Sequence, residues 1–70
     1  AMQIKELDVV ALLRALPEEK LSKGTTGTIV HVYKNNFYEV EFANTKGEAY
    51  AILTISAENL LLLKHEPEMA

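Results

Sequence analysis

The clearest pattern of apolar and polar positions lies in residues 37–42, where the two kinds alternate strictly from Tyr38 onward. Tyr38, Val40 and Phe42 fall on one face of an extended chain, and Glu39 and Glu41 fall on the other. The pattern predicts a strand with one buried face and one wet, acidic face.

A longer apolar run, Leu7–Leu16, shows no such alternation. Its charged residues scatter around a helical wheel and leave no single apolar stripe, whereas Val9 and Val10 favour extended backbone. The run is therefore predicted to be a buried strand rather than a helix. The polar segment Pro17–Gly24 follows as a long loop, with Leu21 as its anchor to the core.

Two glycines three residues apart, Gly24 and Gly27, lead into a β-branched run. Glycine is favoured where φ is positive or where two backbones approach closely, and β-branched residues favour strands. The spacing predicts a sharp turn into a strand over Thr28–Tyr33. Asn35 and Asn36 tolerate left-handed backbone and predict a tight hairpin turn after it.

The remaining segments complete a series of five strands. Asn44–Gly47 predicts a second hairpin turn, and Ala49–Ile55 predicts the strand that follows. Ser56–Asn59 suits one turn of 3₁₀ helix, because the serine hydroxyl can bond nearby backbone amides. Leu60–Leu63 is then the last strand.

This order of elements predicts an all-β, five-stranded SH3-like barrel with a one-turn 3₁₀ helix before the last strand. The predicted domain spans residues 2–64, and residues 65–70 are predicted to be a disordered tail. An OB-fold is the alternative, but the sequence has no room for the helix that such a fold carries between its third and fourth strands.

Composition narrows the functional classes. A chain of 70 residues with no cysteine has a marginal core and neither a disulfide nor a thiolate metal site. Its net charge of −3 opposes binding to phosphates, so nucleic-acid binding is not favoured. No apolar stretch reaches the roughly 18 residues of a membrane helix, and the first residues lack a signal-peptide pattern. A cytoplasmic protein is the expectation.

Side chains that carry catalysis are sparse. Ser22 and Ser56 are the only serines and neither lies in a nucleophile elbow, while His31 is expected to be an ordinary strand histidine. Glu39 and Glu41 would lie about 7 Å apart on one strand, which is read as a solvated face rather than an acid and base pair. The sequence predicts no enzyme, no catalytic residue, no metal, no cofactor and no small-molecule substrate.

Several segments together resemble a known family. They are Leu7–Leu12, Leu16–Glu19, Lys23–Val30, Tyr38–Phe42 and Tyr50–Thr54. The family consists of small bacterial proteins, common in cyanobacteria, that are described only as a domain of unknown function. The resemblance spans roughly residues 4–63 and implies an SH3-like barrel without a catalytic motif.

A looser similarity comes from the G-x-x-G-x-I-x-x-V spacing of Gly24, Gly27, Ile29 and Val32. It is similar to the KOW motif of ribosomal proteins and transcription elongation factors, and in the same general way to the small subunit-like domains of nitrile hydratases. The KOW resemblance implies RNA or DNA binding as an alternative function. The candidate contacts are the loop lysines Lys20, Lys23, Lys34 and Lys46.

Two predicted strands, Val9–Leu13 and Leu60–Leu63, are apolar on both faces, although a half-buried strand needs only one apolar face. As first and last strands they are neighbours in an SH3-like barrel, so the surplus predicts an apolar surface patch. The residues assigned to it are Val10, Leu12, Leu61 and Leu63. The patch favours a homo-oligomer or the small member of a two-protein complex, including an enzyme assembled in trans. In the alternative interpretation, the loop or the N-terminal residues cover it.

Overall fold

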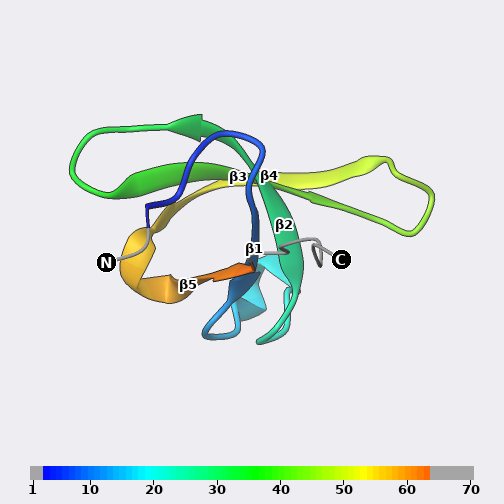
Figure 1. The fold of residues 1–70 in the computed structure, drawn as a ribbon. Helices are drawn as coiled ribbons and strands as arrows, with labels where there is room; N and C mark the ends of the chain where they lie inside the picture. The colour runs from blue at the N-terminus through cyan, green and yellow to red at the C-terminus, as the bar shows by residue number, and fades with distance from the viewer. Residues whose placement is uncertain (1–2, 64–70) are drawn as a thin grey trace, which may run out of the picture.

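One curled antiparallel sheet organises the computed structural model, which describes residues 3–63. The strand order is β4-β3-β2-β1-β5. Figure 1 shows β3 and β4 above β5, with η2 joining β4 to β5 at the left. The strands are β1 (Val9–Leu12), β2 (Thr26–Val32), β3 (Phe37–Ala43), β4 (Ala49–Ser56) and β5 (Leu60–Leu63). The 3₁₀ helices are η1 (Pro17–Glu19) and η2 (Ala57–Asn59).

The fold class predicted from the sequence is confirmed. The sheet has five antiparallel strands, and η2 stands directly before the last strand. Ser56 is the N-cap residue of η2, and its Oγ accepts a hydrogen bond from the backbone N–H of Glu58 at 3.4 Å. The predicted tail, residues 65–70, lies outside the described residues. No helix within residues 3–63 is long and apolar enough to cross a membrane.

The alternation in β3 places the core as predicted. Tyr38, Val40 and Phe42 are buried, with 8%, 0% and 1% of their surfaces exposed. Glu39 and Glu41 occupy the opposite face and are half-buried. The inward side chains of β3 pack against buried residues from every other strand.

The hairpin turn between β2 and β3 confirms its prediction. Asn35 and Asn36 both have φ of 63°, the left-handed backbone that Asn tolerates better than most residues. The carbonyl of Asn36 accepts the backbone N–H of Ala57 at 2.8 Å, which ties this turn to η2.

Gly24 and Gly27 serve the two purposes that favour glycine. Gly24 has φ of +88° in the loop before β2. Gly27 is buried where β2 lies against β3, and a Cβ there would lie 2.7 Å from Val40 Cγ1 and 2.9 Å from the carbonyl oxygen of Glu41. The first glycine permits a turn and the second permits close packing.

The first loop contains a helix that the sequence did not predict. Pro17 opens η1 with its fixed φ, and Lys20 closes it in left-handed backbone. Leu16 and Leu21 exchange two backbone hydrogen bonds of 2.8 and 3.1 Å across its base. Leu21 is 7% exposed, which confirms its predicted role as the anchor of the loop.

The structure corrects the outward face of β1. Val10 and Leu12 are 0% and 2% exposed and point into the core, so they are not surface residues as predicted. Side chains that lie opposite each other in a sheet share a face, and Val10 and Leu12 pair with the inward residues of β5, Leu62 and Leu60. In a strand that is apolar throughout, only this register distinguishes the two faces.

Candidate functional site

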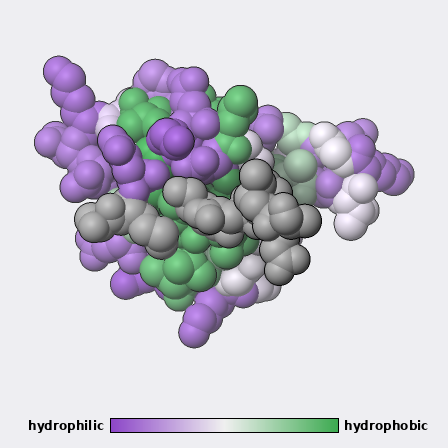
Figure 2. Space-filling model, in the orientation of Figure 1, coloured by the Kyte–Doolittle hydropathy of each residue, from purple (hydrophilic) through white to green (hydrophobic). Residues whose placement is uncertain are grey.

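An uncharged apolar surface covers the outside of β1 and β5. It consists of Val9, Ala11, Leu61 and Leu63, here called the outer face. Val9 pairs with Leu63 and Ala11 pairs with Leu61, so the four side chains form one block. In Figure 2, apolar surface gathers where Figure 1 draws β5.

The outer face remains open to solvent among the described residues. Val9, Leu61 and Leu63 are 42%, 44% and 40% exposed, whereas Ala11 is 8% exposed. The loop and the residues from Gln3 onward therefore leave most of it uncovered. Thr28 and Thr26 of β2 pair with Val9 and Ala11 and continue the same face without a charge.

The four predicted patch residues thus divide equally. Leu61 and Leu63 lie on the outer face, while Val10 and Leu12 lie in the core. Val9 was missed, since no alternation in the run marked it as outward. Its pairing with Leu63 is the only signal that identifies it, and that pairing belongs to the tertiary structure.

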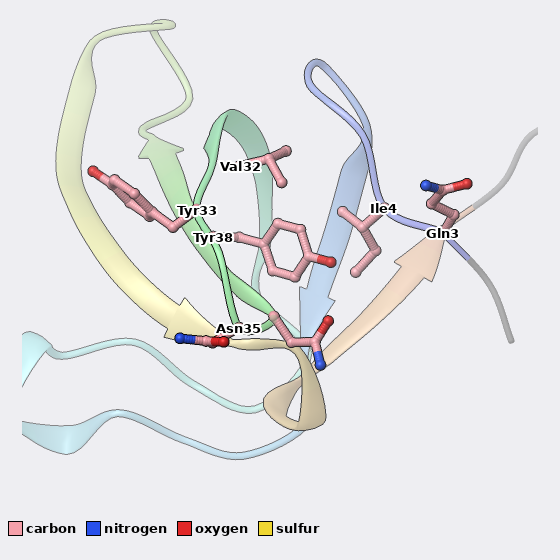
Figure 3. A pocket seen from close by; sticks show the side chains of 7 residues that line it. Gln3, Ile4, Val32, Tyr33, Asn35 and Tyr38 are labelled. Carbon is pink, nitrogen blue, oxygen red and sulfur yellow. The ribbon is translucent and has the colours of Figure 1, made fainter.

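A cleft of about 470 Å³ opens between the N-terminal segment and the β2–β3 turn. Ile4, Val32 and Tyr38 line it together with three side-chain amides, those of Gln3, Asn35 and Asn36. Figure 3 shows the hydroxyl of Tyr38 pointing into this space toward Ile4. None of the lining side chains is a carboxylate or an ammonium group, so the cleft is neutral.

A small polar cluster surrounds Glu39 on the outward face of β3. The Oε1 of Glu39 accepts hydrogen bonds from Thr54 Oγ1 at 2.7 Å and from the Tyr33 hydroxyl at 3.3 Å. Loss of solvent, the negative charge of Glu39 and this hydrogen bond together raise the pKa of Tyr33. The ring of His31 packs against that of Tyr33, with centroids 4.6 Å apart.

The cluster offers one carboxylate and neutral hydroxyl partners. These hydrogen bonds hold the Glu39 side chain in place on the outward face of β3. Among residues 3–63, no group of three His, Cys, Asp or Glu side chains is placed to hold a metal ion.

The four candidate lysines are exposed but are not brought together. Lys20 and Lys23 lie in the β1–β2 loop, Lys34 lies in the β2–β3 turn and Lys46 lies in the β3–β4 turn. Figure 1 shows those two turns projecting in opposite directions. A phosphate backbone would therefore meet separated charges rather than one basic patch.

A comparison with protein families gives a match. Residues 6–62 match the family described as "Domain of unknown function (DUF4926)". Searches of curated proteins and of solved structures found no match. Since the matched segment covers most of the 70 residues, this chain belongs to the DUF4926 family of domains of unknown function.

Proposed function

We propose that this chain is a non-catalytic protein-interaction module that binds a second copy of itself through the outer face. The observation that carries the proposal is the in-register apolar block on β1 and β5, in which Val9, Leu61 and Leu63 each keep at least 40% of their surface exposed. Contiguous apolar surface of this kind is typical of interaction sites.

A twofold arrangement suits this surface, because one patch then packs against its own copy. Burial of a large aliphatic side chain contributes about 1.5–3 kcal/mol. Applied to the exposed fractions of Val9, Leu61 and Leu63 in two copies, this gives roughly 4–8 kcal/mol before the cost of association. Such an assembly should dissociate on dilution.

Light scattering after size-exclusion chromatography tests the proposal across a dilution series at two salt concentrations. The wild-type mass should fall from dimer to monomer on dilution, with little effect of salt, because the contact is uncharged. Leu61→Glu should be monomeric at every concentration. Ile52→Glu is the matched control, since Ile52 is 51% exposed on β4, the opposite edge strand, and it should keep the wild-type mass.

A wild-type chain that stays monomeric at the highest concentration would contradict self-association. If that monomer copurified from its native host with one protein, and Leu61→Glu abolished the recovery, the outer face would belong to a two-protein complex instead. An accessory domain of an enzyme assembled in trans would give the same copurification and the same loss of recovery in Leu61→Glu.

Binding to RNA or DNA stays a second prediction. Nucleic-acid binding requires an affinity that falls steeply as the salt concentration rises. A titration at low salt that shows no binding to single-stranded or duplex probes would exclude this function. Because Lys34 and Lys46 lie in turns that project in opposite directions, nucleic-acid binding is less favoured than self-association. The cytoplasmic location also stays a prediction.

A further inference from the structure

A second groove lies at the other edge of the sheet, along β4. Its volume is about 410 Å³, and four consecutive residues of β4, Leu53–Ser56, line one wall. Leu16 and the acidic residues of η1 line the opposite wall. Successive side chains of a strand point to opposite faces, so a wall of four consecutive residues means that the edge of the strand itself borders the groove.

The backbone of β4 is available along this edge. β4 is a terminal strand of the sheet and pairs only with β3 among the described residues. No backbone hydrogen bond joins Leu53, Thr54 or Ile55 to a described residue outside β3. An edge of this kind presents alternating N–H and C=O groups, which an added strand can pair with.

The groove combines apolar contacts with an acidic rim. Phe37 is 43% exposed, and Leu53 is partly buried against the core. Glu18 and Glu19 supply carboxylates from η1. No lysine or arginine lines the groove.

The acidic wall is held in place by the rest of the fold. The hydroxyl of Tyr50, on β4, donates a hydrogen bond to the carbonyl of Glu19 at 3.3 Å. The paired backbones of Leu16 and Leu21 close the base of η1. A ligand would therefore meet a groove that is already formed, which lowers the ordering cost of binding.

We infer that this groove binds an extended peptide segment of a partner protein, aligned with the free edge of β4. The segment carries an apolar side chain that packs against Leu16 and Leu53, and a lysine or arginine that faces Glu18 and Glu19. Main-chain pairing supplies affinity in this mode of recognition, and the side-chain contacts supply specificity.

This inference does not depend on self-association. None of the four residues of the outer face lines the β4 groove, so the two surfaces use different side chains. In a dimer the two grooves would allow a partner with two such segments to bind with avidity.

Fluorescence anisotropy with a labelled eight-residue peptide of alternating Lys and Val tests the inference at 0.15 M salt. A peptide of alternating Glu and Val should not bind, and eight lysines should bind at least about tenfold more weakly than the alternating Lys and Val peptide. The double variant Glu18→Lys/Glu19→Lys should weaken binding by about tenfold or more. Its matched control, Glu6→Lys/Glu48→Lys, makes the same change in net charge at exposed residues outside the groove and should change binding less than about twofold.

Amide chemical shifts then locate the peptide. Shifts concentrated at Leu53–Ser56 and η1 are the expected result. No binding, an equal loss of affinity in the two double variants, or shifts confined to other strands would each overturn the inference. Leu61→Glu separates it from the proposed function, because that variant should lose the dimer and keep the peptide affinity of each groove.

Discussion

The close approach of β2 to β3 makes Gly27→Ala the most informative single change in the fold. The added methyl would stand 2.7 Å from Val40 Cγ1, 2.9 Å from Phe42 Cδ1 and 2.9 Å from the carbonyl oxygen of Glu41. Two of these atoms belong to side chains that are 0% and 1% exposed, and the third is backbone. None of the three is the free end of a flexible surface side chain.

The cost follows from this crowding. Overpacking a well-packed core typically destabilises a protein by about 1–3 kcal/mol, and the backbone contact places Gly27→Ala at the upper end. In a domain of this size 1 kcal/mol moves the melting temperature by about 4–8 °C. We therefore expect Gly27→Ala to lower the melting temperature by roughly 10–20 °C.

Thermal and urea unfolding, followed by circular dichroism at one fixed protein concentration, measure the effect. Gly24→Ala is the control. Its Cβ would meet nothing within 4 Å, so only the strain of φ at +88° opposes it, at about 1–2 kcal/mol. A Gly27→Ala protein as stable as wild type, or more stable than Gly24→Ala, would refute the packing argument.

Three further changes test the placement of single side chains. Leu12→Ala should lower the free energy of unfolding in urea by about 2–5 kcal/mol, because Leu12 is 2% exposed. Leu61→Ala should lower it by less than about 1 kcal/mol at concentrations where the chain is monomeric, because Leu61 is 44% exposed. Equal losses would contradict the assigned faces of β1 and β5. Tyr38→Phe should change the unfolding free energy by less than about 0.5 kcal/mol, since the Tyr38 hydroxyl donates no hydrogen bond to a described side chain or backbone group. A larger loss would mean that the Tyr38 hydroxyl does have a hydrogen-bond partner. Loss of solvent, followed by the charge of Glu39, raises the pKa of Tyr33, so the contribution of Tyr33 to stability is complete below pH 10 and is lost as the pH rises through the folded-state pKa. Tyr33→Phe should therefore reduce the alkaline loss of stability seen in unfolding curves. An unchanged pH profile would contradict the raised pKa of Tyr33.

The two proposed surfaces use different parts of one sheet. The outer face lies on β1 and β5, and the acidic groove lies along β4. A sheet with two free edges has two sides on which another chain can dock, and here one side is apolar while the other combines apolar and acidic groups. The first suits a copy of this chain, and the second suits a basic partner.

Local patterns determined much of the fold. The alternation around Val40 separates a buried face from a wet face within one strand, and this pattern can be recognised from adjacent residues alone. The left-handed preference of Asn35 and Asn36 places the first hairpin turn in the same way. The last strand was predicted with the bounds that the structure gives it, Leu60–Leu63.

Other features depend on contacts between distant residues. Val30 is the extra residue of a bulge, because the pairing of β2 with β3 shifts between Ile29 and His31. The acidic groove likewise joins η1 to β4, about 30 or more residues along the chain, through contacts such as that of Tyr50 with Glu19. No local pattern marks either feature.

The outer face shows most directly what local patterns determine and what contacts between distant residues decide. The sequence by itself determined that β1 and β5 carry more apolar side chains than one face can bury, but not whether the surplus forms an open surface or is covered by the first loop or the N-terminal residues. It left open which residues form that surface, because in an uninterrupted apolar strand a shift of one residue exchanges the two faces at no cost in local pattern. Only the tertiary structure decided between Val9 and Val10, by pairing Val9 with Leu63 on the outside and closing the core over Val10.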